Sequence, residues 1–297
     1  AGGQTIVDRD AVTGFINIYN NTLFNFGTPS GLGGTATTGY HSGGLTNFNG
    51  YSVVISINKL NDNGNGITAF NGLNTVIFNN DINYSGVSRD FSSWSNVASC
   101  LVRGTKNLSV FDNRFFATGG TSCFVSAGGS TSVETVSIHD NSIKMCGLSA
   151  IGAGHRSGSA TQETNLIEIY DNSIEGFCCG IDADLHSAIY IATINGTSKI
   201  KEIKTDNNIN YLSSNETFNE VTNEVDGSYN VNKTVGNDVG SQYGLVLIAD
   251  TVDGILIAEC NDTILNHQRL GFGADNVKHL TTNLNIDNCG WSRDLSN

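Results

Sequence analysis

The stretch VSIHDNSIKMCG, residues 136–147, recurs almost unchanged 31 residues later as IEIYDNSIEGFCCG, residues 167–180. In both copies β-branched and polar residues alternate up to Asp-Asn-Ser-Ile, and then a cysteine and a glycine follow. Alternation with a period of two is typical of a strand that buries one face. Asp and Asn tolerate the left-handed backbone of a tight turn. The stretch therefore predicts a strand, a sharp corner and a second strand.

Similar stretches recur along the chain, each centred on an asparagine that follows a short strand. The clear copies place Asn21, Asn80, Asn113, Asn141 and Asn172, and weaker copies lie near Asn208, near Asn261 and at the end of the chain. The steps between the three central copies are 28 and 31 residues. Repeats of this length indicate a solenoid, in which each coil buries its apolar side chains against the next. We therefore predict an all-β parallel β-helix with stacked asparagines at one corner and little helix.

Composition supports many tight turns and excludes several classes of function. The chain has 38 Asn and 35 Gly but a single Pro. Its formal net charge is −13, with only 15 Lys and Arg among 297 residues. A nucleic-acid partner is not expected, because phosphate contacts need clustered basic residues. Membrane insertion is not expected either, because no apolar run approaches the ~20 residues of a membrane span.

Seven cysteines are present, and none forms a C-x-x-C pair. Cys146, Cys179 and Cys289 occupy the same place relative to the isoleucine and glycine of their copies. We predict that these three point inward and stay reduced as packing groups. Cys146 and Cys179 should touch on neighbouring coils. No zinc site and no other metal or cofactor is expected.

The repeat is interrupted at about residues 27–50, which are rich in Gly, Thr and Ser, and at about 211–242, which are polar and acidic. Both stretches are interpreted as insertions that leave the solenoid at a corner, where binding surfaces are often built. We expect one domain over residues 1–297. Because the sequence starts at Ala1 without a Met, we expect this domain to be part of a longer chain.

The recurring I-x-I-x-[DN]-N-x-I pattern resembles the right-handed parallel β-helix of the pectate-lyase-like superfamily over roughly Thr5 to Trp291. Within that superfamily, the high Asn, Gly, Ser and Thr content, the unpaired cysteines and the acidic charge look most like the β-helical body of a bacteriophage tailspike. The resemblance implies a homotrimer located on the virion tail, or an extracellular protein. It also implies that bacterial surface polysaccharide is bound and cleaved.

Glycosidic-bond cleavage needs two carboxyl groups, one protonated and one ionised. The segment GIDADLHSAIY supplies a candidate pair, because Ile181 and Ala183 should face inward and leave Asp182 and Asp184 facing outward. The two lie about 6.5 Å apart along a strand. Repulsion between carboxylates raises one pKa, as a general acid requires. We predict Asp182 and Asp184 as the catalytic residues.

Substrate-binding residues are expected around this pair. Aligning the two copies at their glycines places His155 and Arg156 of one coil near His186 of the next. These side chains could orient hydroxyl or carboxylate groups of a sugar. Tyr190 is an aromatic that could stack on a sugar ring.

Two other functions are compatible with the same pattern. One is a secreted polysaccharide lyase or epimerase of this fold, although few lysines accompany the acidic residues. The other is a non-catalytic carbohydrate-binding adhesin or structural solenoid, in which the aspartates and histidines are ordinary solvated groups. The sequence leaves the identity of the polysaccharide open.

Overall fold

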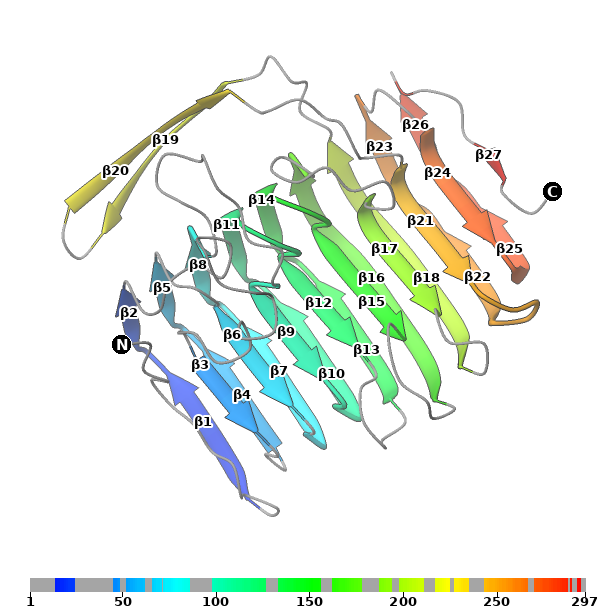
Figure 1. The fold of residues 1–297 in the computed structure, drawn as a ribbon, viewed down its shortest axis with the longest axis horizontal. Coiled ribbons are helices and arrows are strands. Elements are labelled where there is room, and N and C mark those ends of the chain that lie inside the picture. The colour runs from blue at the N-terminus through cyan, green and yellow to red at the C-terminus, as the bar shows by residue number, and fades with distance from the viewer. Residues whose placement is uncertain are drawn as a thin grey trace.

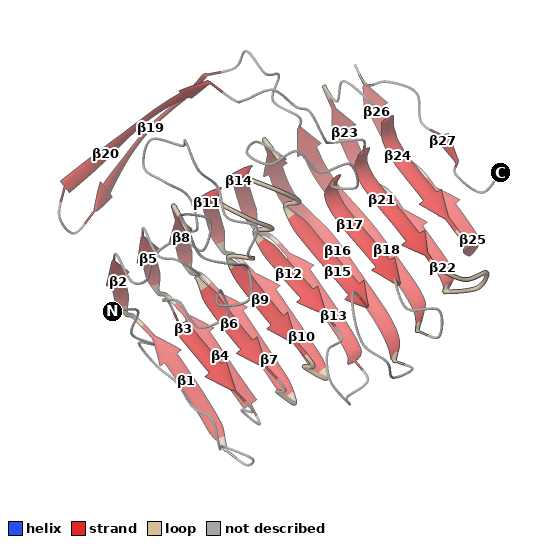
Figure 2. Ribbon diagram, in the orientation of Figure 1, coloured by secondary structure: helices blue, strands red, loops and turns tan. Residues whose placement is uncertain are grey.

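The computed structural model describes residues 14–24, 45–48, 52–61, 66–70, 72–85, 98–126, 133–155, 162–177, 187–193, 198–210, 217–224, 227–234, 243–266, 270–287, 289 and 293–294. Regular structure in these residues is entirely strand (Figure 2). Within the same ranges no helix exists that is long and apolar enough to cross a membrane.

The strands wind into nine stacked coils, numbered here in chain order, and each coil contributes one strand segment to each of three faces (Figure 1). The first face contains β1 (Phe15–Tyr19), β4 (Ser52–Ser56), β7 (Asn74–Phe78), β10 (Asn107–Phe111), β13 (Val133–His139), the first part of β16 (Glu163–Glu175), the first part of β18 (Lys199–Asn210), β22 (Ile255–Cys260) and β25 (Val277–Thr282). The second face contains β2 (Thr22–Phe24), β5 (Lys59–Asn61), β8 (Asp81–Asn83), β11 (Arg114–Thr118), β14 (Ser142–Cys146), the ends of β16 and β18, β23 (Thr263–Leu265) and β26 (Asn285–Asp287). The third face contains β3 (Leu45–Phe48), β6 (Ile67–Phe70), β9 (Cys100–Arg103), β12 (Cys123–Ser126), β15 (Ile151–His155), β17 (Ser187–Thr193), β21 (Tyr243–Ala249), β24 (Leu270–Asp275) and β27 (Arg293–Asp294).

All pairs between coils are parallel, so the predicted all-β parallel β-helix is confirmed. A separate antiparallel hairpin, β19 (Thr217–Glu224) and β20 (Gly227–Thr234), lies within the 211–242 stretch. The 27–50 stretch includes β3, which pairs with β6 and so belongs to the third face. Residues 25–44 lie outside the described residues.

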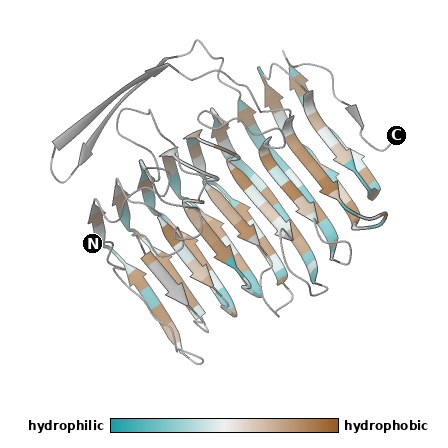
Figure 3. Cartoon of the chain, in the orientation of Figure 1, coloured by the Kyte–Doolittle hydropathy of each residue, from teal (hydrophilic) through white to brown (hydrophobic). Residues whose placement is uncertain are grey.

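The core fills the inside of the coils, and strand alternation explains it. The inward residues Val110 of β10 and Ile138 of β13 are fully buried. The residues on either side of each in its strand point outward and are half-buried. Brown and teal segments accordingly alternate along many strands in Figure 3. Each inward side chain packs on its counterpart one coil away, so that one continuous apolar cluster runs through the solenoid. This burial is the main stabilising term of the fold.

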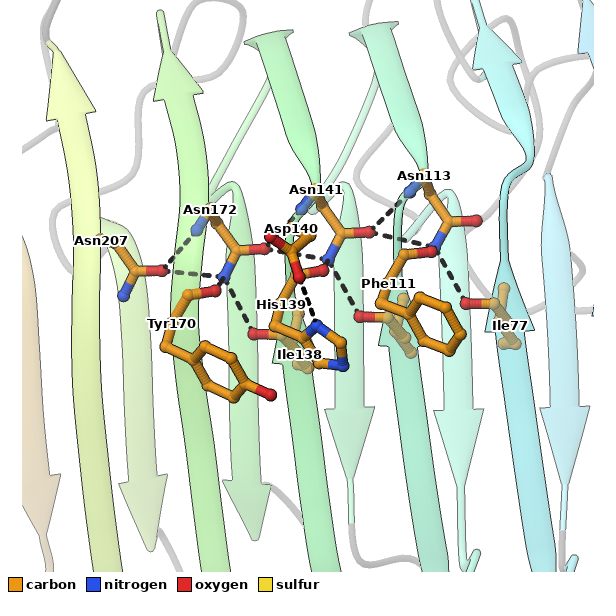
Figure 4. A network of polar contacts seen from close by, with 11 residues as sticks. Ile77, Phe111, Asn113, Ile138, His139, Asp140, Asn141, Tyr170, Asn172 and Asn207 are labelled. Carbon is orange, nitrogen blue, oxygen red and sulfur yellow. Dashed lines mark hydrogen bonds and ion pairs between the residues drawn. The ribbon is translucent and has the colours of Figure 1, made fainter.

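Stacked asparagines form the corner between the first and second faces, and we call this row the asparagine ladder. Its members are Asn21, Asn58, Asn80, Asn113, Asn141, Asn172, Asn207 and, in the eighth coil, Asp262. In a typical step, Asn113 donates its backbone N–H and its Nδ2 to Oδ1 of Asn141, both at 3.0 Å (Figure 4). Its Nδ2 also donates to backbone oxygens of Ile77 and Phe111. The predicted corners at Asn113, Asn141 and Asn172 are therefore confirmed.

A residue with positive φ precedes each asparagine of the first six coils, and it turns the chain through the corner. These residues are Asn20, Ile57, Asn79, Asp112, Asp140 and Asp171, with φ between 53° and 57°. Asn and Asp adopt this conformation at low cost, but a β-branched residue does so only with strain. Ile57 is also 49% exposed, so burial does not offset that strain.

Replacing Ile57 with Asn should raise the free energy of unfolding by about 1 kcal/mol, because Asn tolerates the left-handed conformation. Thermal or urea unfolding would measure this gain. The matched control is Ile257→Asn, which changes an isoleucine of similar exposure (48%) in β22. Equal changes in the free energy of unfolding for the two substitutions would show that backbone strain at Ile57 does not lower the stability of the protein.

The corner loses one residue in the seventh coil. Against β16, the register of β18 shifts between Tyr170 and Ser173, and the residue before Asn207 has no positive φ. The ladder therefore continues through Asn207 and Asp262, and the predicted positions near Asn208 and Asn261 are wrong by one residue.

The cysteine prediction is confirmed only in part. Cys146 is buried and Cys289 is half-buried, and neither forms a disulfide. Cys146 donates its backbone N–H to Gly176 O, and the buried residue that follows is Phe177, so Phe177 stacks on this position. Cys179 lies outside the described residues. Two other thiols, Cys100 and Cys123, are register partners on the third face.

Candidate functional site

The longest connections of the solenoid all leave at one corner, between the second and third faces. They span residues 25–44, 84–99, 176–186 and 211–242. At the corner between the third face and the next coil, the longest connection is only 156–162. The asparagine corner has none. Insertions gathered along one edge of a solenoid are typical of its binding side, so this corner and the third face that it borders are the candidate site.

One row of outward positions on the third face contains no charged residue. Register places Thr68, Leu101, Phe124, Gly152, Tyr190, Val246 and Gly273 in one row across seven coils. Leu101 and Phe124 are at most 8% exposed and form an apolar cluster with Ala98. Tyr190 is half-buried, and its ring belongs to this outward row. Across the four coils from Gly152 to Gly273, Tyr190 is thus the one aromatic residue of this row.

Two glycines beside Tyr190 are required by close packing. A Cβ on Gly152 would lie 2.7 Å from Cδ2 of Phe124. Gly154 has φ +116°, and a Cβ there would lie 2.1 Å from the backbone oxygen of Ala192. Neither position admits a larger residue without a shift of its neighbour. The sequence GAG in β15 therefore lets the Phe124 ring pack over Gly152 and lets the backbone of Ala192 approach Gly154.

The structure places two of the six predicted site residues. Tyr190 lies on β17, outward, with Gly152 and Val246 as register partners. His155 ends β15, and its backbone pairs with Thr193. Asp182, Asp184, His186 and Arg156 lie outside the described residues. The first three belong to the connection 176–186, which enters the third face at Ser187.

The predicted neighbourhood of His155 needs correction. Aligning the repeats at their glycines placed it near His186 and Ala188, but the register pairs Ile151 with Ile189 and His155 with Thr193. The reason is the different length of the connections that lead into the third face. The connection before β17 spans residues 176–186, whereas the one before β15 spans only residues 147–150. His155 therefore pairs five residues further along β17 than Ala188.

An aromatic row was missed by the sequence analysis. Phe78, Phe111, His139 and Tyr170 stack on the outside of the first face, with centroids 4.8–5.1 Å apart and nearly parallel rings. Figure 4 shows the last three of these residues. His139 Nδ1 also lies 2.8 Å from Oδ2 of Asp140. The signal was present in the repeats, because each of these residues stands two places before a ladder asparagine. Since each inner ring turns both faces to its neighbours, the row stabilises the coils and leaves little ring surface for a ligand.

A charged cluster occupies the second face. Arg114 contacts Asp81 at 3.0 Å, donates to Asn83, and lies 5.1 Å from the ring centroid of Phe116. In the next coils, Lys144 pairs with Glu175 at 3.2 Å. These partly exposed pairs hold neighbouring coils in register and are each worth little in free energy.

Asp262 is the one carboxyl group with a raised pKa among the described residues. It is fully buried at the end of the ladder, where it accepts hydrogen bonds from Thr205 Oγ1 (2.5 Å) and Asn207 Nδ2 (2.7 Å). Burial raises its pKa to about 6, although these hydrogen bonds oppose the rise. Among the described residues, the hydrogen-bond partners of its carboxyl group are Thr205 and Asn207 of β18, which indicates a structural role.

Stability should therefore fall with rising pH in a way that depends on Asp262. The pKa of Asp262 in the folded state lies above the ordinary value of 3.8, so the folded chain binds the proton more tightly than the unfolded chain. The stability that this proton contributes is lost as pH rises from about 4 to 6. Asp262→Asn keeps an acceptor for Asn207 and removes the buried charge. We expect it to stabilise the protein above pH 6 by up to ~3 kcal/mol, with little gain at pH 4.

Urea unfolding of both proteins at pH 4, 5, 6 and 7 would measure this difference. Asp287→Asn is the control, since Asp287 is exposed on β26. A stability difference between Asp262→Asn and wild type that stays constant over the series would contradict the assignment.

No protein-family model matches the chain, and comparisons with curated proteins and with solved structures give no significant match.

Proposed function

We propose that this protein binds bacterial surface polysaccharide, an O-antigen or a capsule, and cleaves its glycosidic bonds as part of a phage tailspike. The parallel β-helix is compatible with polysaccharide binding or processing. The observation that carries the proposal is the gathering of all the longest connections along one edge of the third face. Nine coils at about 4.8 Å per coil make this edge about 40 Å long, which suits an extended polymer of several sugar units.

The local chemistry supports the same edge. Connection 176–186 contains Asp182 and Asp184 and leads directly into β17, where Tyr190 lies in the outward row with Gly152 as its register partner. An aromatic side chain suits the apolar face of a sugar ring, while two carboxyl groups suit acid–base cleavage. In this proposal one aspartate protonates the leaving oxygen, and the other activates water or attacks the sugar. His155, Arg156 and His186 orient the substrate.

We further propose that the working unit is a homotrimer on the virion tail. The acidic chain, with net charge −13, fits an uncharged or weakly charged polysaccharide better than a strongly anionic one. No cofactor takes part in this scheme.

The test is incubation of the protein with purified O-antigens and capsular polysaccharides, followed by size analysis of the products. Shortened oligosaccharides with new reducing ends support hydrolysis. Products with an unsaturated sugar at the new end would indicate a lyase instead. Polysaccharide that binds but keeps its length would indicate an adhesin, and absence of both binding and cleavage across the panel would overturn the proposal.

A further inference from the structure

We propose that Cys100 and Cys123, two buried thiols on neighbouring coils, form an intramolecular disulfide when the folded protein meets a small-molecule disulfide as oxidant. Cys100 begins β9 and Cys123 begins β12, and the two are register partners. The bond ties the third coil to the fourth, directly behind the outward residues Leu101 and Phe124. It makes this pair a modification site of the third face.

The register of the sheet places the two side chains next to each other. Neighbouring strands lie about 4.8 Å apart, so register partners have Cα atoms at about that separation. Disulfides join cysteines whose Cα atoms are about 4.4–6.8 Å apart and whose Cβ vectors do not point away from each other. Cys100 and Cys123 both belong to the core inside the coils, whereas Leu101 and Phe124 form a separate cluster outside. The geometry therefore allows a bond between the two sulfur atoms.

The two thiols are in direct contact, and the backbone holds them there. The hydrogen bond with the Cys123 thiol, followed by burial, raises the pKa of Cys100 well above its ordinary value. Cys100 donates its backbone N–H to Ser122 O at 2.8 Å, and Cys123 donates to Ala150 O at 3.0 Å. Both side chains are fully buried. Two groups held together in this way react with each other much faster than with a second molecule of oxidant.

Two other fully buried thiols lack such a neighbour in register. Cys146 has Thr118 as its register partner on the preceding coil. Cys260 lies between Thr205 and Thr282. Burial alone therefore does not distinguish the proposed pair, but the adjacent second thiol does.

The reaction is thiol–disulfide exchange in two steps. One cysteine thiolate attacks a sulfur of the oxidant, forms a mixed disulfide and releases one oxidant thiolate. The other cysteine thiolate then attacks the cysteine sulfur of this mixed disulfide and releases the second oxidant thiolate. The two released thiolates take up the two protons that the cysteines lost. Two cysteine sulfurs are oxidised and two sulfurs of the oxidant are reduced, so that atoms and electrons balance.

Access and thiolate formation limit the rate of this reaction. Because both thiols are buried, a small oxidant reaches them only when the coils open locally. The raised pKa of Cys100 also keeps its thiolate scarce at neutral pH. Disulfides persist in oxidising surroundings and are rare in the cytosol. The virion or extracellular location of the proposed function supplies such surroundings, but the reaction itself does not depend on that function.

The test is incubation of the purified, folded chain with bis(2-hydroxyethyl) disulfide at about pH 8.5, near the ordinary pKa of a thiol. Remaining thiols are then alkylated and the protein is analysed by mass spectrometry. We expect a product that has lost two hydrogen atoms. Trypsin cleaves after Arg103, Lys106 and Arg114 and so separates the two cysteines. Peptides 90–103 and 115–144 should therefore be recovered as one species, which reduction converts back to two.

Cys260 is the control within the same protein, because it is equally buried but has no thiol beside it. It should take no part in a cross-link. The variants Cys100→Ala and Cys123→Ala should each lose the cross-linked species, and peptide mapping of the wild type decides the question even where a variant fails to fold. The oxidised wild type should melt at or above the temperature of the reduced protein, because the bond removes conformations from the unfolded chain.

Three results would overturn the proposal. One is a wild type in which Cys100 and Cys123 remain thiols or carry the oxidant as mixed disulfides. Another is a loss of two hydrogen atoms that maps to other cysteines. The third is an oxidised protein that melts below the reduced one, because the fold would then not accommodate the bond. The measurement needs no polysaccharide, so its outcome is independent of the cleavage assay.

Discussion

Replacing Asn141 with alanine should lower the free energy of unfolding by about 3–5 kcal/mol, a large effect for a polar residue. Asn141 accepts two hydrogen bonds from Asn113 and donates three, to Asn172 Oδ1 and to the backbone oxygens of Val110 and His139. Alanine removes all five bonds, takes the acceptor from the buried backbone N–H of Asn113, and weakens the hydrogen bonding of buried groups on three coils. Each unsatisfied buried group costs about 1–3 kcal/mol, and partial relaxation of the corner offsets some of the sum.

Chemical unfolding of the variant measures this loss, with Asn107→Ala as the control. Asn107 is also an asparagine in a row across coils, but its hydrogen bonds to Asn74 and Thr135 are exposed. We expect that control to cost less than about 1 kcal/mol. Equal costs at Asn141 and Asn107 would show that the ladder contributes no more than surface hydrogen bonds.

Asp182→Asn and Asp184→Asn should each reduce the cleavage rate by about 10²–10⁴-fold on the polysaccharide that the wild type shortens. Asparagine keeps the size of the side chain but cannot donate a proton to the leaving oxygen, accept one from water or act as a nucleophile. Binding of the intact polymer should change much less than the rate. Initial rates of reducing-end formation, together with the binding constant of each variant, separate the two effects.

Asp171→Asn is the matched control, because it removes the same charge at an exposed corner residue of the same coil. It should keep the wild-type rate. All three variants should keep the wild-type melting temperature within about 2–4 °C. Full activity of both Asp182→Asn and Asp184→Asn would move the reaction to other residues, such as a groove between subunits.

The sequence predicted the coil architecture because its determinants are local and repeated. Alternating isoleucines around Asn141 and Asn172 specify which side chains enter the core, and one residue of slip would expose all of them. The ladder member Asn58 was missed because Ile57 stands where the other copies have Asp or Asn. The aromatic row was likewise present in every central copy, but its meaning depends on contacts between coils.

Register across the long connections could not be predicted in the same way. A solenoid fixes which strands stack, but the number of residues that leave the coil between two strands is independent of that stacking. This is why His155 pairs with Thr193. The repeats therefore do not predict where candidate residues within such a connection lie, and Asp182 and Asp184 are among these residues.

Both the fold and the position of the candidate site depend on the stacked asparagine corners, and hydrogen exchange tests them most directly. The backbone amides of Asn80, Asn113 and Asn141 donate to the side-chain oxygen of the next asparagine at 3.0–3.1 Å. We predict that these corner amides exchange as slowly as those of the buried strand residues Ile138 and Ile143. Exchange at the rate of an unstructured peptide would contradict the stacked ladder, and with it the placement of every coil.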